Sequence, residues 1–201
     1  MKGLQFLGNR VEDAAMSFIN VLKYSDQSVD YPSFENLEEW PDEILDLFNA
    51  AARNNPHSEL TAVIQYSQQA VQFDEISELM LGIALVEMQH SDKINDFLKK
   101  ADGTISSFIM NITPLTIPLG RNPKEALNEA LKSELLTIGK YKEILDLINN
   151  KEWYYTCSDA SIVEAFLEKL IADEQHHVKL LREALGTESQ TKSKGVTVII
   201  R

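Results

Sequence analysis

Four long stretches of this chain repeat apolar side chains at intervals of three and four residues, a spacing that places them on one face of an α-helix. Glycine and proline number only 8 and 6, and they cluster between these stretches. Outside the last residues of the chain, no alternating pattern typical of strands competes with them. We therefore predict an all-α fold in which four helices form a bundle. The predicted helices cover residues 56–73, 74–101, 123–149 and 159–185.

Shorter or irregular structure is predicted around this bundle. Residues 11–23 are weakly helical, and residues 25–41 form a polar connection without a regular period. Pro41 and the acidic residues that follow it are typical of a helix N-terminus, so residues 42–52 predict a short helix. The predicted organisation is an N-terminal extension over 1–55, the bundle over 56–185, and a flexible tail or an added strand over 186–201.

Charge and cysteine content narrow the classes of function. The chain has 19 Lys and Arg against 31 Asp and Glu, and its net charge of −12 argues against nucleic acid or an anionic membrane as the main partner. The single cysteine, Cys157, excludes an internal disulfide framework and a four-cysteine metal site. No apolar run is long enough for a signal peptide or a membrane span, so we expect a cytoplasmic protein.

Charged side chains interrupt the apolar stripes at positions where leucine or isoleucine would be expected. Burying an isolated carboxylate costs several kcal/mol unless it is paired or ligated, and several buried carboxylates repel one another. A pair of divalent cations between them is the simplest way to hold them inside a bundle. The interrupting residues are Glu59, Glu87 with His90 three residues later, Glu134, and Glu174 with His177 three residues later.

The spacing and the depth of these residues both support a metal site. Residues three apart on a helix project from the same face, so a glutamate and a histidine at this spacing can converge on one ion. Bundles that hold two metals take one Glu from each of two helices and Glu-x-x-His from each of the other two. Glu59 lies 14 residues before Phe73 and Glu87 lies 13 residues after Asp74, so both are about 20 Å from the turn between their helices. We therefore expect all six side chains at the middle of the bundle.

This set of residues resembles the ferritin-like di-metal carboxylate proteins, and among them the rubrerythrin-like group, over residues 56–185. The resemblance implies a ferritin-like four-helix bundle in which residues 102–122 form the long connection between the second and third helices. It also implies two metal ions, with iron favoured and manganese as the alternative. The metal ligands that it implies are Glu59, Glu87, His90, Glu134, Glu174 and His177.

Three further positions match the pattern of such sites. Asp173 precedes Glu174, and in similar proteins this aspartate accepts a hydrogen bond from the histidine of the opposite helix, here His90, and fixes its tautomer. Tyr66 and Tyr141 each follow a ligand glutamate by seven residues, where related sites carry tyrosines close to the metals. Both tyrosines can also be ordinary core residues, and that alternative stays open.

Two departures from the rubrerythrin-like pattern limit what the resemblance implies. These proteins usually carry a second glutamate one turn after the ligand of the third helix, and this chain has Thr137 there. They often carry a four-cysteine iron domain that supplies electrons, which a single cysteine cannot build. A peroxide reductase of this type would therefore need an external electron donor.

The favoured function is that of a dinuclear iron protein that reacts with hydrogen peroxide or dioxygen, with Tyr66 or Tyr141 as a proton or hydrogen-bond donor. Two alternatives stay open. A dimanganese catalase-like enzyme would use the same ligand types, because glutamate and histidine do not separate iron from manganese. A non-enzymatic iron-binding or storage protein would use the same fold. The expected assembly is a homodimer, and the expected partners are the small-molecule oxidant and the electron donor.

Overall fold

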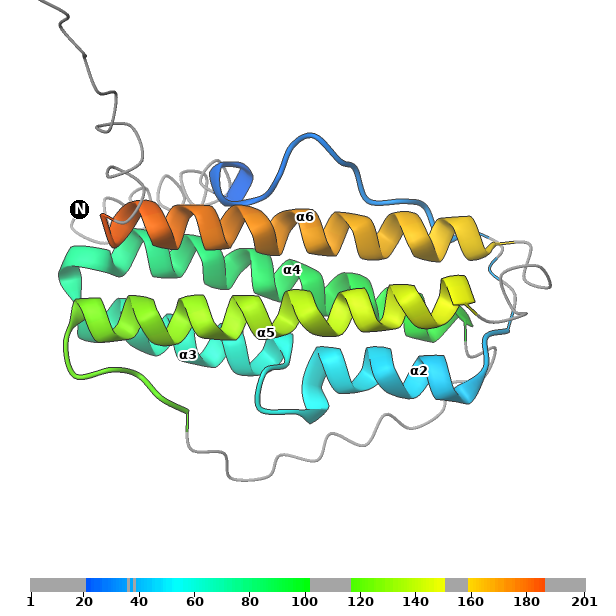
Figure 1. Ribbon diagram of the computed structural model, residues 1–201, viewed down its shortest axis with the longest axis horizontal. Helices are drawn as coiled ribbons and strands as arrows, with labels where there is room; N and C mark the ends of the chain where they lie inside the picture. The colour runs from blue at the N-terminus through cyan, green and yellow to red at the C-terminus, as the bar shows by residue number, and fades with distance from the viewer. Residues whose placement is uncertain (1–20, 36, 38, 102–116, 151–158, 187–201) are drawn as a thin grey trace, which may run out of the picture.

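The computed structural model describes residues 21–35, 37, 39–101, 117–150 and 159–186. Within these ranges every regular element is helical, and four long helices run along one axis as a bundle (Figure 1). The predicted all-α four-helix fold is thereby confirmed. The predictions for residues 11–20, 102–116 and 187–201 lie outside the described residues. The four helices are α3 (Glu59–Gln72), α4 (Ser77–Ala101), α5 (Pro123–Asn150) and α6 (Ala160–Ala184).

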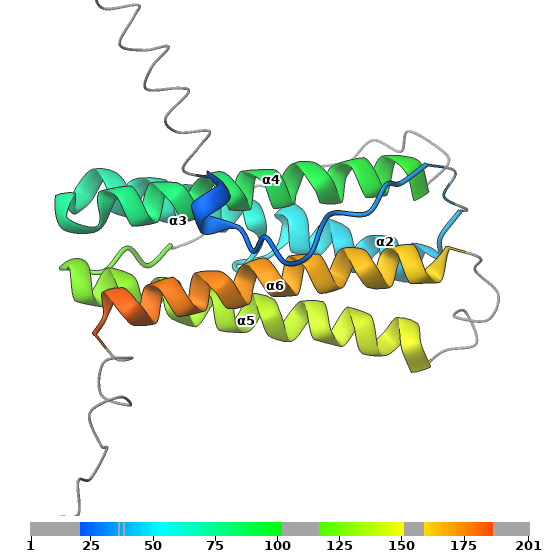
Figure 2. The ribbon, with the colours of Figure 1, turned by 90° about the horizontal axis from the view of Figure 1, so that it is seen from above.

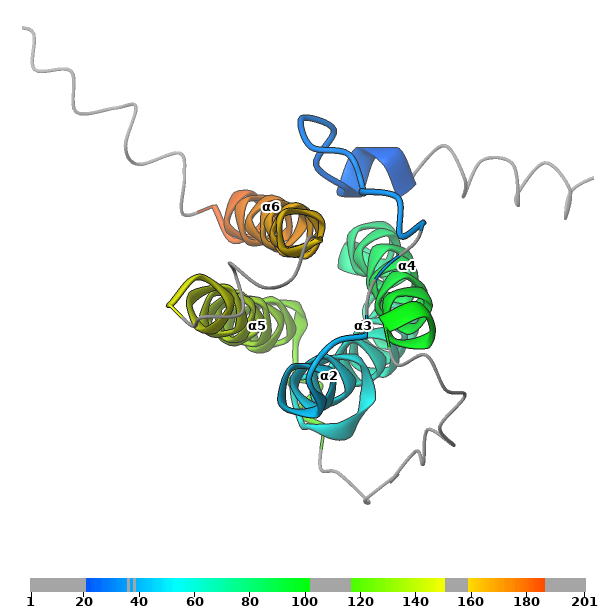
Figure 3. The same cartoon turned by 90° about the vertical axis from the view of Figure 1, so that its right-hand side faces the viewer.

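The bundle consists of two antiparallel pairs, α3 with α4 and α5 with α6 (Figures 2 and 3). A short 3-10 turn, Asp74–Ile76, joins the first pair. α4 ends at one end of the bundle and α5 starts at the opposite end (Figure 1). This arrangement requires a long connection between the second and third helices. No helix among the described residues is both long and apolar enough to cross a membrane.

One of the four helix positions of the bundle, that of α3, is occupied by two helical segments in succession. α3 has only 14 residues, about half the length of the other three helices. Beyond its N-terminal end lie α2 (Asp42–Asn49) and the π-helix Ala50–Asn54, which occupy the remaining length of this helix position (Figures 1 and 3). The break falls next to Glu59, the first residue of α3.

The prediction that a helix starts at Asn55 and Pro56 is wrong by one turn. The Oδ1 atom of Asn55 accepts from the backbone N–H of His57 at 2.7 Å, which makes a local turn instead of a helix cap. Ser58 caps α3, since its Oγ accepts from the backbone N–H of Thr61 at 3.3 Å.

The N-terminal segment, of which residues 21–35, 37 and 39–41 are described, runs lengthwise between α4 and α6 in Figure 2. It is irregular after a helical turn over 21–24, as predicted, yet it supplies the buried side chains of Tyr24, Phe34 and Trp40. The backbone N–H of Trp40 donates to the carbonyl of Ala101, which ties the segment to the end of α4. This part of the predicted extension therefore packs into the same core as the bundle.

Two apolar clusters fill the bundle on either side of its middle. On α4 one cluster takes Met80 and Ile83, and the other takes Ile94 and Phe97. Aromatic rings dominate the second cluster, where the ring centroids of Phe48 and Phe97 lie 4.6 Å apart. The residues of α4 between the two clusters carry the polar side chains described next.

Candidate metal centre

The six predicted ligands meet at the middle of the bundle, between the two apolar clusters. Every one of them is at most 2% exposed. α3 supplies one glutamate from its first turn, α5 supplies one from its middle, and α4 and α6 each supply a glutamate and a histidine. We call this group the six-residue centre; its members are Glu59, Glu87, His90, Glu134, Glu174 and His177.

Within the centre, the ligand atoms form two sets that share two glutamates. In each set four possible ligand atoms lie within 4.8 Å of one another. Each set contains one histidine, one glutamate of its own and both shared glutamates, as a pair of neighbouring ions requires. The His90 set is Glu59, Glu87, His90 and Glu174, and the His177 set is Glu87, Glu134, Glu174 and His177.

The shared glutamates direct one oxygen to each set. Nδ1 of His90 lies 3.3 Å from Oε2 of Glu87 and 3.2 Å from Oε1 of Glu174. Nδ1 of His177 lies 3.0 Å from the other oxygen of Glu87 and 3.5 Å from the other oxygen of Glu174. Both carboxylates are therefore placed to bridge two ions, and both imidazoles present Nδ1 to the space between.

Burial and mutual repulsion perturb the protonation of the centre. Burial raises the pKa of Glu59 and of Glu134 well above the usual value, and the neighbouring carboxylates of Glu87 and Glu174 raise it further. Burial alone would lower the pKa of His90, but contacts with surrounding acids outweigh burial and raise it well above the usual value. The same balance raises the pKa of His177. Without a cation, the centre therefore holds protons in place of positive ions.

Several buried atoms of the centre have no hydrogen-bond partner in the part of the chain that the structure describes, and this fits a bound cation. Buried polar atoms are nearly always satisfied, so each unpaired one calls for an explanation. The unpaired atoms have the chemistry of iron or manganese ligands, namely carboxylate oxygens and imidazole nitrogens without a thiolate. The residues present thus suit two such divalent ions. The unpaired atoms of the centre are Oε2 of Glu59, Oε1 of Glu87, both carboxylate oxygens of Glu174 and both ring nitrogens of His177.

Both predicted tyrosines reach the centre. The hydroxyl of Tyr66, on α3, donates to Oε1 of Glu134 on α5, and the hydroxyl of Tyr141, on α5, donates to Oε1 of Glu59 on α3. Burial raises the pKa of the Tyr66 phenol well above its usual value, so the proton stays on the hydroxyl. Tyr66 therefore donates to the glutamate that belongs only to the His177 set, and Tyr141 donates to the glutamate that belongs only to the His90 set.

Asp173 lies behind His90, where the resemblance placed it. Its Oδ2 is 3.2 Å from Nε2 of His90, on the side of the ring away from the centre. Burial alone would raise the pKa of Asp173, but His90 and Lys169 hold it well below its usual range, so the carboxylate stays charged. Four further groups donate to this carboxylate: Lys169 Nζ at 2.8 Å, Ser25 Oγ at 2.9 Å, the Asp26 backbone N–H at 2.6 Å and Tyr31 OH at 3.0 Å.

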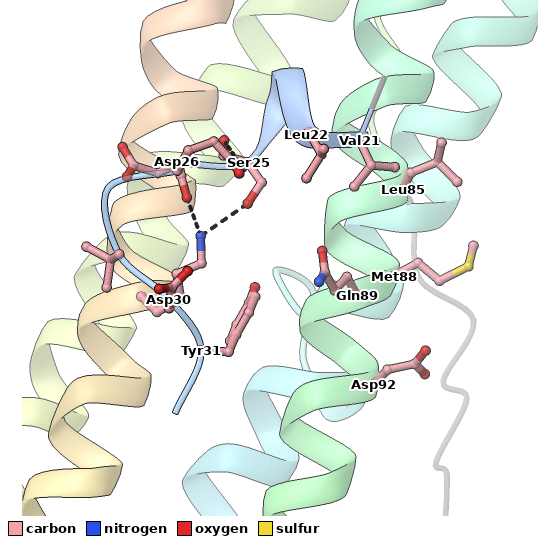
Figure 4. Close-up of a pocket in the computed structure, with 13 residues that line it drawn as sticks. Val21, Leu22, Ser25, Asp26, Asp30, Tyr31, Leu85, Met88, Gln89 and Asp92 are labelled. Carbon is pink, nitrogen blue, oxygen red and sulfur yellow. Dashed lines mark hydrogen bonds between the residues drawn. The ribbon is translucent and has the colours of Figure 1, made fainter. Parts of the chain in front are cut away.

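Sequence reasoning missed these four donors. Lys169 is one turn before Asp173 on α6, and that spacing next to a ligand motif was a usable signal. Ser25 and Tyr31 lie in an irregular segment far away along the chain, and no local pattern points to them. A cavity of about 480 Å³ lies beside this group, and its wall includes Tyr31 and Lys169. Figure 4 shows it between the N-terminal segment and α4, with Leu85, Met88, Gln89 and Asp92 opposite.

Thr137 takes no part in the contacts of the centre. Its hydroxyl donates to the carbonyl of Ser133 at 3.2 Å, within its own helix, and lies 3.4 Å from the carbonyl of His57. The second glutamate usual in rubrerythrin-like proteins is therefore replaced by a side chain bonded to backbone.

Comparison with known proteins gives a consistent result. The profile of the Ferritin-like domain family matches residues 55–191, more than half of the chain. A Rhodobacter capsulatus bacterioferritin structure, described as having a metal-free dinuclear site and a haem iron in a crystallographic special position, is 23% identical over 76% of this chain and 89% of that chain, with a TM-score of 0.59. A structure of ferritin-like, diiron-carboxylate proteins from Bacillus anthracis strain Ames is 22% identical over 72% of this chain and 96% of that chain, with a TM-score of 0.56. No curated protein matches.

Proposed function

The chain belongs to the ferritin-like domain family, and from this premise we propose that the six-residue centre holds two iron ions that react with hydrogen peroxide or dioxygen. One observation carries the proposal: the two ligand sets share Glu87 and Glu174, and each shared carboxylate presents one oxygen to either set. Two ions held in this way are close enough to act on one small molecule. We also propose that the protein is of the rubrerythrin-like subtype.

The residues of this chain would support the reaction by charge and by proton supply. Two bound ferrous ions would supply the two electrons that reduce hydrogen peroxide to two waters, a reduction that also takes up two protons. The carboxylates of the centre offset the positive charge that the ions gain. The hydroxyls of Tyr66 and Tyr141 already bond Glu134 and Glu59, and these hydrogen bonds hold a proton next to each ligand set. An external electron donor would be needed to return the ions to the ferrous state.

Metal analysis and anaerobic oxidation test this proposal. Protein purified from iron-supplemented culture is expected to hold about two irons per chain, one for each set. Addition of peroxide or dioxygen to the ferrous protein should oxidise both ions within a single turnover. A Glu87→Ala variant removes a ligand from both sets and should lose most of the iron. Unchanged iron content in that variant would refute the centre.

The role of the tyrosines needs its own comparison. Tyr66→Phe removes a hydroxyl that bonds the centre and should slow ferrous oxidation by about 100-fold without loss of iron, the usual scale for a positioned proton donor. Tyr24→Phe is the matched control, because Tyr24 is also buried but its hydroxyl faces Glu78 at 3.4 Å. Equal rates in both variants would reduce Tyr66 to a packing residue.

The two alternative functions predict other readouts. A dimanganese catalase-like enzyme would release dioxygen from peroxide without any added reductant. An iron-storage protein would form a large assembly that takes up far more iron than two ions per chain. We propose a homodimer instead, because large apolar side chains are exposed on adjoining helices: Ile64 and Val71 on α3, and Leu81 and Met88 on α4. Light-scattering mass in solution separates a dimer from a cage.

A further inference from the structure

The two ligand sets have the same chemistry but different support. Nε2 of His90 faces the carboxylate of Asp173 at 3.2 Å. Nε2 of His177, the ring nitrogen on the side away from the glutamates, has no hydrogen-bond partner among the described residues. The cause is visible in the two helices, since Asp173 precedes the shared glutamate of α6, whereas the residue before the shared glutamate of α4 is the buried Val86.

The support behind His90 is itself fixed on several sides. Lys169 and Ser25 donate to one oxygen of Asp173, and Tyr31 donates to the other. Lys169 also donates to the backbone carbonyl of Asp26 at 2.5 Å, so the N-terminal segment and α6 hold each other at this point. His90 is therefore oriented before any ion binds, with Nδ1 toward the glutamates.

A ring held in this way binds metal better than a ring without a partner. A carboxylate on the second nitrogen fixes the tautomer and the ring orientation and makes the ligand nitrogen more basic, and loss of such a partner costs about 10- to 100-fold in metal affinity. His177 must adopt its tautomer and orientation during binding. Its neighbours on the ligand side are equivalent to those of His90, so the difference lies in what holds the ring from behind.

We propose that the two metal positions are unequal: the His90 set binds the first ion and retains it, and the His177 set binds the second ion and releases it first. This inference rests on the proposed function, because it requires a centre that holds two ions. It assigns Asp173, Tyr31 and Lys169 as positioning residues for one ion only. It also makes the His177 position the exchangeable one of the pair.

Repulsion between two neighbouring cations is a different source of unequal binding, and half-site variants separate the two explanations. His177→Ala leaves the His90 set complete, and His90→Ala leaves the His177 set complete. We expect His177→Ala to bind one ion with the affinity of the first wild-type step, and His90→Ala to bind one ion about 10- to 100-fold more weakly. Repulsion alone predicts equal affinities for the single ion in both variants.

Variants that keep all six ligands provide the second test and do not depend on the histidine replacements folding. Asp173→Asn and Tyr31→Phe should weaken the first binding step and leave the second step unchanged. Val86→Asn places an acceptor before the shared glutamate of α4 and should strengthen the second step. Tyr24→Phe, which keeps a buried ring and removes a hydroxyl that faces Glu78 and not the centre, should change neither step.

The metal-free full-length protein is titrated with Co²⁺, and the visible absorption of the bound ion is recorded at each step. Anaerobic equilibrium dialysis measures the binding of Fe²⁺. Two unequal wild-type steps, with the first step lost only when His90 or its support is changed, are the expected result. Two equal steps, or equal binding by His90→Ala and His177→Ala, would overturn the inference and leave the dinuclear centre intact. Wild-type protein that binds neither ion would instead overturn the proposed function.

Discussion

Lys169 lies in the protein core, is only 3% exposed, and directs its ammonium group at acceptors on α6 and on the N-terminal segment. Its ammonium group donates to Asp173 at 2.8 Å and to the Ser25 hydroxyl at 3.1 Å. The six-residue centre beside it contains four carboxylates, so Asp173 adds one more negative charge to a crowded region. Lys169 offsets that charge and lets Asp173 remain an anion behind His90.

Replacement of Lys169 should therefore be costly. Lys169→Met fills a similar volume but leaves Asp173 buried without its counter-charge, and loss of one partner of a buried ion pair costs about 3–5 kcal/mol of the free energy of unfolding. Urea denaturation of the metal-free protein measures this. The control is Lys179→Met on the same helix, where the side chain is exposed and the expected change is within about 0.5 kcal/mol. Similar losses in both variants would show that Lys169 does not stabilise the core.

At the scale of helices, the N-terminal segment packs closely on α4 at Gly82. A Cβ atom at Gly82 would lie 2.0 Å from Cε2 of Tyr24, whereas a Cβ atom at Gly139 of α5 would meet nothing within 4 Å. Glycine inside a helix usually costs stability relative to alanine. Gly82 is retained on α4 because the ring of Tyr24 occupies the space of its side chain.

The same substitution should thus have opposite effects on the two helices. Gly139→Ala should raise the free energy of unfolding by about 0.5–1 kcal/mol through helix propensity alone. Gly82→Ala should lower it, because the ring of Tyr24 must leave its buried site and the adjoining segment must shift. Thermal unfolding gives the sign of each change, and limited proteolysis should cut the N-terminal segment faster in Gly82→Ala only. Stabilisation by both alanines would mean that the segment is not packed on α4.

At the scale of the whole molecule, the centre couples protonation to folding. The pKa values of His90 and His177 are raised in the folded state, so the folded chain binds more protons than the unfolded chain near neutral pH. The stability from these protons is fully present below about pH 6.5 and is lost as pH rises through the folded-state pKa values. The raised pKa values of Glu59 and Glu134 act in the same direction. The lowered pKa of Asp173 gives stability that is lost only in acid.

Metal-free protein should accordingly melt at a lower temperature at pH 8 than at pH 6. Metal binding requires deprotonated ligands, so stabilisation by a saturating divalent cation should grow over the same interval. Calorimetry with and without metal across this range measures how the melting temperature of the metal-free protein, and its increase on metal binding, change with pH. In a His90→Gln, His177→Gln double variant the part of the metal-free slope that comes from the two imidazoles should disappear, and the part that comes from Glu59 and Glu134 should remain. A melting temperature of the metal-free wild type that rises from pH 6 to pH 8 would contradict the pKa directions.

Much of this molecule was predictable because helical periodicity is a local property. Apolar spacing placed α4, α5 and α6 close to their observed ends, and the Glu-x-x-His spacing placed a carboxylate and an imidazole on one face of α4 and again on α6. The distance of each glutamate from the turn of its hairpin brought all six side chains to one level. Asp173 stood out because it precedes Glu174 while Val86 precedes Glu87.

Contacts between distant segments could not be predicted in this way. Asn55 and Pro56 have the local chemistry of a helix start, yet the chain continues through a turn and α3 begins at Glu59. Ser25 and Tyr31 become partners of Asp173 only because the N-terminal segment lies between α4 and α6. The sequence by itself determined the helices and the candidate ligands, since both depend on spacing within one helix. The tertiary structure alone decided how Asp173 is held behind His90, because two of its donors, Ser25 and Tyr31, lie more than a hundred residues before it in the chain.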